Sequence, residues 1–393
     1  MVKEIAISIY LFVFRILFNF FKLFTLKTKT VCVATFGDNI FYTTKALSKL
    51  SDEEVVILKS SSCKYLFHNL KATIIPFTLK HPIAYIKSIY HLATAKTILI
   101  DNYYGFLAAT SFKQGVTCIQ LWHAGGAIKQ FGLKDPTNKF RSKKANERFQ
   151  QVYNTFHYTV VGSERMAETF KESFGLTDDR ILRKGIPRSD VLFDHSMKES
   201  IYNQMVKKHP IINNKQIILY APTFRNDQLS HYQLQLDIGK LYQELSEDYV
   251  LLIKPHPAVT YDISEAYQDF VYDVSEFYDT NQLLLITDIL ITDYSSIPFE
   301  YALLEKPMIF YAYDMEEYRL TSGLIDDYEQ QMPGPVVAST EAIILTIKEN
   351  KFNYGKIKEF AKQWNEYSNG KSSMNLAKYL TDTELKEREK AII

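Results

Sequence analysis

The feature that most restricts the fold of this sequence is a repeated alternation of short, continuous apolar runs with helix-like segments. Strands buried on both faces of a parallel sheet read as continuous apolar runs, whereas half-exposed strands alternate apolar and polar residues. The helix-like segments between the runs include 83–94 and 164–174. We therefore predict an α/β architecture in which helices cover both faces of parallel sheets. The predicted strands are Val31–Ala34, Val55–Leu58, Ala72–Pro76, Thr97–Ile100, Val116–Trp122, Tyr158–Val161, Ile181–Ile186, Gln216–Tyr220, Tyr249–Ile253, Ile289–Ile291 and Met308–Tyr311.

A polar stretch between Arg188 and Pro210 interrupts this alternation, which restarts at Gln216. The chain has 393 residues, a length that fits two domains. We predict two Rossmann-like domains, residues 29–195 and residues 196–380. Ligands of such sheets bind outside the carboxyl ends of the strands, so we expect the ligand in a cleft between the two sets of strand ends.

Charge and cysteine content exclude several classes of protein. The net charge is +1 and no nucleic-acid-binding module is present, so nucleic acid is not an expected partner. Cys32, Cys63 and Cys118 lie in or beside apolar runs, as the reduced core cysteines of a cytoplasmic protein do. The sequence has no CxxC, HExxH, Walker A or DxD motif. It therefore predicts neither a metal site nor a cofactor.

Residues 1–28 form a strongly apolar opening segment that a few polar residues interrupt. Ser8, Arg15, Asn19 and Lys22 fall on one stripe of a helix whose remaining surface is rich in Leu, Phe and Ile. Because polar residues break the apolar run, the pattern favours a helix lying in the membrane interface over a spanning helix. We predict peripheral attachment to the cytoplasmic face of the cell membrane, with the basic residues attracted to anionic lipid. The alternative is a helix packed on its own domain.

A hydroxyl-rich turn follows the apolar run at 289–291 and comprises Asp293, Tyr294, Ser295 and Ser296. Pro298 stands where the first turn of a short helix is expected. Backbone N–H groups at a helix start and serine hydroxyls can together bind an anion such as phosphate. The alternative is that one of the serines only caps the helix.

His123 follows the predicted strand Val116–Trp122 and precedes a glycine pair, Gly125 and Gly126. Glycines permit the close approach of backbone or ligand, and histidine is the side chain best suited to act as a general base at neutral pH. A lone histidine can also be structural, but its place at a strand end favours a functional role.

Cationic and hydroxyl side chains follow three other predicted elements. The strand at 216–220 leads to Thr223 and Arg225, and a forked arginine contact suits phosphate. The strand at 249–253 leads to Lys254 and His256. Charged groups directly after a buried strand need a partner, which phosphate can supply. Arg188 closes the first domain near the expected cleft. An exposed arginine in a salt bridge is the alternative for Arg225.

Seven segments, in matching order over about residues 30–370, carry a resemblance to a known family. They are DNYY (101–104), LWHAGGAIKQFGLKD (121–135), GIPRSD (185–190), APTFR (221–225), KPHP (254–257), TDYSSIPFEYALL (292–304) and FYAYD (310–314). They resemble the CDP-glycerol glycerophosphotransferase family, whose members build teichoic acids and related capsule polymers. The resemblance implies a GT-B architecture, with two Rossmann-like domains facing across a cleft, and CDP-glycerol as the donor.

The resemblance also implies roles for individual residues. His123 matches the family histidine proposed as the base. Arg225, His256 and the turn 293–296 match positions around the donor pyrophosphate, and His256 is a second catalytic candidate. Glu300 lies where GT-B donors place their ribose. The family residue after the Trp-His pair is often glycine, whereas this sequence has Ala124, a departure that fits the primase branch.

Phosphoryl transfer is the reaction that the resemblance implies. An acceptor hydroxyl, deprotonated by His123, attacks the glycerol-bearing phosphate, and CMP leaves. The length and the opening segment resemble glycerol-phosphate primases, which add the first unit to an undecaprenyl-diphosphate-linked N-acetylmannosaminyl-N-acetylglucosamine. Alternatives are a glycerol- or ribitol-phosphate polymerase, a nucleotide-sugar glycosyltransferase or epimerase of the same fold, and a non-catalytic membrane scaffold.

Overall fold

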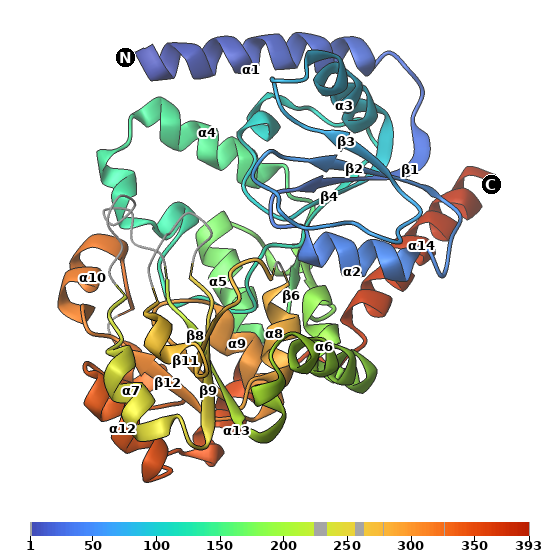
Figure 1. Cartoon of the computed structure of the whole chain (residues 1–393). Coiled ribbons are helices and arrows are strands. Elements are labelled where there is room, and N and C mark those ends of the chain that lie inside the picture. Colours follow the sequence, from blue (N-terminus) through green and yellow to red (C-terminus); the bar gives the residue numbers. More distant parts are fainter. Residues whose placement is uncertain (1, 224–233, 256–262, 278, 326, 393) are drawn as a thin grey trace. The chain divides into compact units, whose positions relative to one another are not determined.

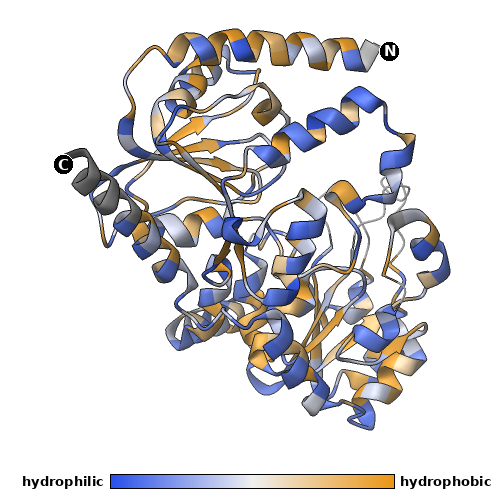
Figure 2. Ribbon diagram, turned by 180° about the vertical axis from the view of Figure 1, so that it is seen from behind, coloured by the Kyte–Doolittle hydropathy of each residue, from blue (hydrophilic) through white to orange (hydrophobic). Residues whose placement is uncertain are grey.

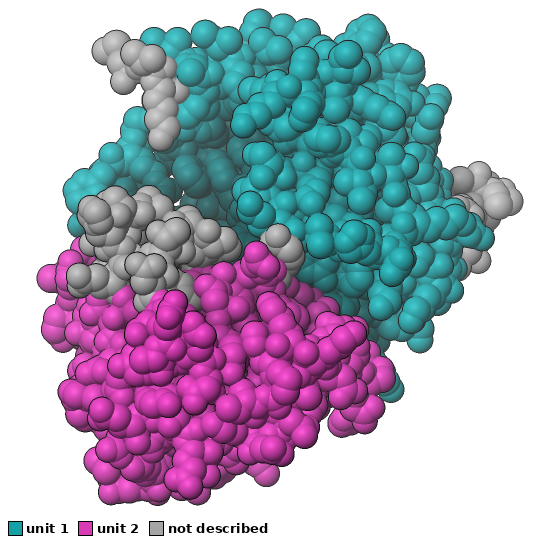
Figure 3. Space-filling view, in the orientation of Figure 1, with its two compact units in different colours: residues 1–123, 131–190, 367–393 teal, residues 124–130, 191–366 magenta. Residues whose placement is uncertain are grey.

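The computed structural model describes residues 2–223, 234–255, 263–277, 279–325 and 327–392 (Figure 1). The chain divides into two compact units, which Figure 3 colours separately. Unit 1 consists of Met1–His123, Phe131–Asp190 and Tyr367–Ile393, and unit 2 consists of Ala124–Gln130 and Val191–Glu366. Each unit thus combines separate stretches of the chain. The continuous domain limits 29–195 and 196–380 stay a prediction.

Unit 1 is built on a parallel sheet. In its described part, seven strands are ordered β3-β2-β1-β4-β5-β6-β7, and all neighbours are parallel. The chain order reverses between β1 and β4, which makes their carboxyl ends the switch point where α/β sheets bind ligands. The strands are β1 (Lys27–Ala34), β2 (Glu54–Lys59), β3 (Thr73–Pro76), β4 (Ala95–Ile100), β5 (Thr117–Gln120), β6 (Tyr158–Val161) and β7 (Ile181–Arg183).

Helices cover the faces of this sheet because the strands bury apolar side chains in both directions. On one face, alternate residues of the strands pack with α2 (Asp38–Leu47) and α14 (Ser372–Ile392). The helix α3 (Pro82–Thr94) contacts β1, β3 and β4. The other helical segments before residue 191 are η1 (Gly105–Ala109), η2 (Gly132–Lys134), η3 (Pro136–Phe140), α4 (Lys143–Asn154), α5 (Glu164–Phe174), η4 (Asp178–Arg180) and the start of η5 (Pro187–Phe193).

The N-terminal helix α1 (Val2–Phe21) packs on α3 and η1 through one of its faces. Phe14 and Phe18 are each 1% exposed, and the Tyr10 and Tyr85 hydroxyls are 2.6 Å apart. The opposite face is apolar and exposed, and Figure 2 shows hydrophobic residues along the length of this helix. Its residues are exposed by 49–64%; they are Ile5, Ile9, Phe12, Val13, Ile16 and Phe20.

The polar stripe of α1 lies beside the packing face and contacts other parts of unit 1. The Lys144 amino group donates to Ser8 Oγ at 2.9 Å, and the Lys22 amino group donates to Ser111 Oγ at 2.8 Å. Arg15 reaches the Ala108 carbonyl at 3.5 Å. The helix therefore has two apolar faces, one buried against its own unit and one exposed.

The segment GIPRSD at 185–190 anchors the C-terminal segment to unit 1. Gly185 has a φ of +80°, and a Cβ there would lie 2.4 Å from the Tyr367 carbonyl oxygen, so only glycine fits. The Asp190 carboxylate accepts the backbone N–H groups of Ser372 and Ser373, both at 2.8 Å. A carboxylate satisfies free donors at a helix start, so Asp190 holds the first turn of α14.

Unit 2 is built on a second parallel sheet. Its described residues form six strands in the order β10-β9-β8-β11-β12-β13, and all neighbours are parallel. The strands are β8 (Gln216–Ala221), β9 (Tyr249–Ile253), β10 (Val271–Asp273), β11 (Ile289–Thr292), β12 (Met308–Tyr311) and β13 (Val336–Val337). The helical segments are α6 (His195–Lys208), η6 (Pro210–Asn214), α7 (Ile238–Leu245), η8 (Glu265–Tyr267), α8 (Thr280–Ile286), α9 (Ile297–Tyr301), η9 (Ala302–Leu304), α10 (Met315–Ser322), α11 (Tyr328–Gln331), α12 (Thr340–Lys348) and α13 (Tyr354–Trp364).

The predicted α/β class, with a parallel sheet in each of two Rossmann-like units and an N-terminal apolar helix, is confirmed. In unit 2, one face of the sheet packs with α7 and α12. Every predicted strand overlaps an observed one, while the short strands β10 and β13 were not predicted.

Candidate active site

In unit 1, the carboxyl ends of β1, β4 and β5 bring functional side chains together at the switch point of the sheet. Thr35 follows β1, Asp101 follows β4, and Trp122 with His123 follows β5. Trp122 has a φ of +57°, a left-handed conformation that a non-glycine residue rarely adopts. This turn ends the strand and directs His123 back over its end.

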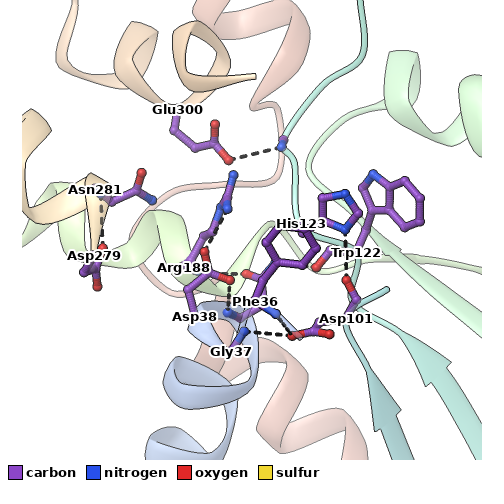
Figure 4. A network of polar contacts seen from close by, with 12 residues as sticks. Phe36, Gly37, Asp38, Asp101, Trp122, His123, Arg188, Asp279, Asn281 and Glu300 are labelled. Carbon is purple, nitrogen blue, oxygen red and sulfur yellow. Dashed lines mark hydrogen bonds and ion pairs between the residues drawn. The ribbon is translucent and has the colours of Figure 1, made fainter. Parts of the chain in front are cut away.

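His123 is held in a defined orientation (Figure 4). Its Nδ1 lies 3.0 Å from the Asp101 carbonyl oxygen, which can only accept, so Nδ1 carries the proton. Phe36 stacks on the imidazole with ring centroids 4.0 Å apart, and Trp122 with centroids 4.3 Å apart. Two rings at these distances cannot share one face, so they cover opposite faces. Burial lowers the pKa of His123 to about 4. The neutral ring then has its lone pair on Nε2.

An ion pair between Arg188 and Asp38 lies near His123 in the same unit. An Arg188 guanidinium nitrogen is 2.8 Å from Asp38 Oδ2, and both side chains are mostly buried. The Arg188 backbone N–H donates to Asn39 Oδ1 at 2.9 Å, and the Asn39 amide donates to the Trp122 carbonyl at 3.0 Å. The Arg188 charge lowers the pKa of His123, whereas the Asp38 charge raises it. The pair therefore shapes the electrostatics of the histidine.

In unit 2, the predicted turn after β11 joins the end of β8. Asp293 is 2% exposed, and its Oδ1 accepts the backbone N–H of Thr223 at 2.7 Å. Ser295 Oγ lies 2.9 Å from Thr292 Oγ1 and accepts the N–H of Ile297 at 3.3 Å. Ser296 is the N-cap residue of α9 but makes no capping bond through its side chain. Ser295 thus stabilises the turn, and α9 is only five residues long.

Two other predicted site residues, Tyr294 and Glu300, are buried in unit 2. Tyr294 is 1% exposed, stacks on Tyr318 with centroids 3.9 Å apart, and donates to Asp314 at 3.1 Å. Glu300 is 1% exposed, and its Oε1 accepts the backbone N–H of Gly125 at 3.1 Å. Tyr294 thus anchors the turn in the core of unit 2, and Glu300 holds the segment that follows His123 in the chain.

The glycine pair was predicted to permit the close approach of backbone or ligand. Within unit 2, the group that approaches Gly126 closely is the side chain of Phe299. A Cβ on Gly126 would lie 2.3 Å from the Phe299 ring. The segment continues to Lys129, which forms an antiparallel bridge with Leu324 and lies 4.9 Å from the Tyr318 ring centroid. These contacts fix residues 124–130 in unit 2.

Lys254 lies at the end of β9, and its amino group donates to the Phe277 carbonyl at 2.5 Å. Burial lowers the pKa of Lys254 to about 8, and the nearby negative charges of Asp279 and Asp273 partly oppose this by raising it. Arg225 and His256, predicted to contact the donor, lie outside the described residues.

The sequence reasoning assigned no role to Asp101, Phe36 or Asp38. Asp101 was noticed only as part of a segment that resembles the family. A possible signal is position, because each of the three lies at or just after the carboxyl end of β1 or β4. Among the described residues, no group of three or more His, Cys, Asp or Glu side chains is placed to hold a metal ion.

Comparisons with known proteins give a consistent result. Residues 19–382 match the family model of CDP-Glycerol:Poly(glycerophosphate) glycerophosphotransferase. A teichoic acid glycerol-phosphate primase of Bacillus subtilis strain 168 is 42% identical over 302 residues, 77% of each chain. A teichoic acid poly(ribitol-phosphate) polymerase of Bacillus spizizenii strain W23 is 38% identical over 292 residues, 72% of this chain and 46% of the relative.

A solved structure of a variant of the wall teichoic acid polymerase TagF with CDPG has the same fold. The two chains match with a TM-score of 0.81 over 99% of each chain, at 23% sequence identity. The family match covers most of the chain, including both sheets and the segments around His123 and Asp293. The chain therefore belongs to the CDP-glycerol glycerophosphotransferase family of transferases.

Proposed function

We propose that this enzyme is a teichoic acid glycerol-phosphate primase, which transfers one glycerol phosphate from CDP-glycerol to a lipid-linked disaccharide. The observation that carries the proposal is the state of His123: a neutral imidazole whose Nδ1 donates to the Asp101 carbonyl and whose Nε2 is the basic atom. The primase is favoured over a polymerase by the higher identity to a primase, 42% against 38%.

The base acts on the acceptor hydroxyl. His123 Nε2 takes the hydroxyl proton, the oxygen forms a bond to the glycerol-bearing phosphorus, and the bond from that phosphorus to the CMP oxygen breaks. The electron pair leaves with CMP. The imidazolium that forms is stabilised by the Asp101 carbonyl and the Asp38 carboxylate, both of which favour the protonated ring.

The donor is assigned to the carboxyl end of the unit 2 sheet. Thr223, Lys254 and the turn at 293–296 lie at the ends of β8, β9 and β11. Arg225 and His256 follow two of these strands in sequence, and we assign them with Lys254 to the pyrophosphate, whose leaving charge needs cations. Glu300 stays our candidate for the ribose, and its bond to Gly125 offers a second, structural role.

The proposal is tested by incubating the enzyme with CDP-glycerol and the lipid-linked disaccharide and analysing the products by mass spectrometry. We expect CMP and an acceptor enlarged by one glycerol phosphate. Products with many added units would make the enzyme a polymerase. Release of UDP from a nucleotide sugar would make it a glycosyltransferase or epimerase, and no turnover of any donor would favour the scaffold.

The acid limb of the pH–rate profile is expected far below that of an ordinary histidine. A general base must be unprotonated, and burial lowers the pKa of His123 to about 4 from an ordinary 6.5. Since kcat/KM reports the ionisation of the free enzyme, kcat/KM should stay flat from about pH 7 down to about pH 5 and fall only near pH 4. Initial rates in constant-ionic-strength buffers measure this. A half-maximal point near pH 6.5 would contradict the lowered pKa of His123.

Donor binding is expected to depend on the unit 2 residues. Arg225→Ala and Ser295→Ala should weaken the binding of CDP-glycerol and of CDP by about tenfold or more, since a hydrogen bond to a charged group contributes about 1.5–3 kcal/mol. Arg225→Lys should also bind poorly, because lysine cannot form the forked contact. Calorimetry with CDP measures the affinities. Ser264→Ala, which removes a serine cap at η8 of the same unit, is the matched control. Unchanged affinity in the first three variants would remove these residues from the site.

The exposed apolar face of α1 supports attachment to the membrane. The segment Glu4–Phe21, with a mean hydropathy of 1.8, is long and apolar enough to span a bilayer. Contacts through Tyr10, Phe14 and Phe18 nevertheless hold one face of the helix against the rest of unit 1. We therefore propose that α1 lies in the interface of the inner leaflet, where a lipid-linked acceptor is presented.

A further inference from the structure

The buried carboxylate of Asp101 organises the backbone after β1. Asp101 is fully buried, and its Oδ2 accepts three consecutive backbone N–H groups, those of Thr35, Phe36 and Gly37, at 3.1, 3.0 and 2.8 Å. Its Oδ1 accepts the Tyr104 hydroxyl at 2.7 Å. Burial raises the pKa of Asp101 to about 6, although the hydrogen bonds from Tyr104, Thr35 and Gly37 lower it. A buried carboxylate is tolerated only with such donors, so its bonds define the turn.

The turn that Asp101 holds carries Phe36, whose ring stacks on His123 at an interplanar angle of 12°. Gly37 has a φ of +96°, and a Cβ there would lie 2.7 Å from Tyr65 Cβ, so this backbone path admits only glycine. Phe36 is 42% exposed, so packing around its own ring does not fix its position. The backbone path of the turn fixes it instead.

The same aspartate contacts the histidine directly through its main chain, because its carbonyl oxygen lies 3.0 Å from His123 Nδ1 (Figure 4). We propose that Asp101 is a positioning residue for the base: its carbonyl selects the tautomer with Nε2 as the proton acceptor, and its carboxylate places Phe36 against the imidazole. This inference rests on the proposed function of His123. Under this inference, Asp101 and Phe36 influence the reaction by holding His123 in place, and neither residue contacts the reacting atoms.

A purely structural role for Asp101 is the competing explanation. Asp293 of unit 2 makes a similar contact. It follows β11, and its carboxylate accepts the backbone N–H of Thr223, which follows the neighbouring strand β8, at 2.7 Å. What distinguishes Asp101 is that the backbone it holds carries a ring stacked on the histidine that its own carbonyl contacts. A structural role predicts lost stability alone, whereas the positioning role predicts a changed histidine.

The test is nitrogen NMR of the full-length enzyme labelled in histidine, with the His123 signals assigned by their loss in His123→Ala. In the wild type we expect a protonated Nδ1 and an unprotonated Nε2 throughout pH 5–7.5. In Phe36→Leu, water reaches the ring, and His123 should titrate inside this window, toward its ordinary value. The charged groups that act on it, Arg188 and Asp38, are unchanged in this variant.

Kinetics with the lipid-linked acceptor provide the second readout. Phe36→Leu should lower kcat by about tenfold and Asp101→Asn by about 100-fold, with the acceptor KM within about twofold, because a misplaced base affects the chemical step more than binding. Ser163→Ala, which removes the N-cap of α5 in the same unit, is the matched control for lost stability and should leave both readouts unchanged.

The proposal is overturned if Phe36→Leu keeps His123 neutral throughout pH 5–7.5, or if kcat of either variant stays within about twofold of wild type. A rise in acceptor KM at unchanged kcat would instead place the exposed Phe36 ring against the acceptor, and would overturn it too. These outcomes are separate from failure of the proposed function, which would appear as full activity in His123→Ala.

Discussion

His123→Ala is expected to lower kcat by about 100- to 10,000-fold, the usual contribution of a general base. The donor should bind as in the wild type, because His123 lies at the strand ends of unit 1 while the donor is assigned to unit 2. Since the base acts only on the acceptor hydroxyl, the loss should fall on the chemical step. Single-turnover rates of CMP release and calorimetry with CDP-glycerol measure the two effects separately.

Two further variants make this result specific. His123→Asn keeps a side-chain N–H for the Asp101 carbonyl but has no basic nitrogen, so it should be as inactive as His123→Ala. His157→Ala is the control: His157 Nδ1 accepts the Cys118 N–H at 2.9 Å within the same unit, and the assigned chemistry does not use it. Activity of His123→Ala within a few fold of wild type would make His123 structural and remove the proposed mechanism.

The sheets could be predicted because their strands are buried on both faces and therefore carry an apolar signal. The predicted run Val116–Trp122 is longer than β5, because Trp122 adopts a left-handed conformation that apolarity does not reveal. β13 consists of Val336–Val337 alone, too short for any periodicity. The return of the chain to unit 1 at Tyr367 depends on Asp190 and Ser372, residues 182 positions apart.

From the residues alone, candidates for the site could be named where a residue follows a strand, as His123, Thr223 and Asp293 do. Glu300 was named only through the family resemblance. Asp101 and Glu300 act through bonds to backbone N–H groups far away in sequence, 64 residues for Gly37 and 175 for Gly125. Such partners follow from strand order and register, which a single sequence does not reveal. The polar side chains of Tyr294 and Glu300 likewise gave no sign that they are buried.

The N-terminal helix shows what helical periodicity can and cannot reveal. The polar stripe through Ser8, Arg15 and Lys22 was predicted correctly as one stripe, and the two possibilities considered were lipid contact or packing on the domain. In the structure, α1 packs through Phe14 and Phe18 and also exposes an apolar face. Arg15 and Lys22 also make exposed hydrogen bonds to the rest of unit 1, to the Ala108 carbonyl and to Ser111 Oγ.

Phe12→Glu combined with Ile16→Glu is expected to release the enzyme from anionic vesicles. Phe12 and Ile16 are 64% and 53% exposed on the apolar face of α1, opposite Phe14 and Phe18. Burying one such side chain contributes about 2 kcal/mol, so losing two should lower the partition coefficient by about 1000-fold. The fold should persist, because the packing face is untouched, and activity on a short-chain soluble acceptor should stay at the wild-type level. Vesicle sedimentation and soluble-acceptor assays measure the two.

Two comparisons separate apolar burial from charge in this result. Arg15→Gln with Lys22→Gln, which removes two positive charges without adding negative ones, should weaken binding less, by about 1 kcal/mol per charge at most, and high salt should reproduce that smaller effect because salt screens exposed charges. Leu345→Glu, which places the same substitution at a 49% exposed leucine on α12 of unit 2, should leave vesicle binding unchanged. If the Phe12 and Ile16 variant still sediments fully with the vesicles, α1 is not the membrane-binding element. Release by the Arg15 and Lys22 substitutions alone would mean that electrostatic attraction, and not burial of the apolar face, holds the enzyme at the lipid surface.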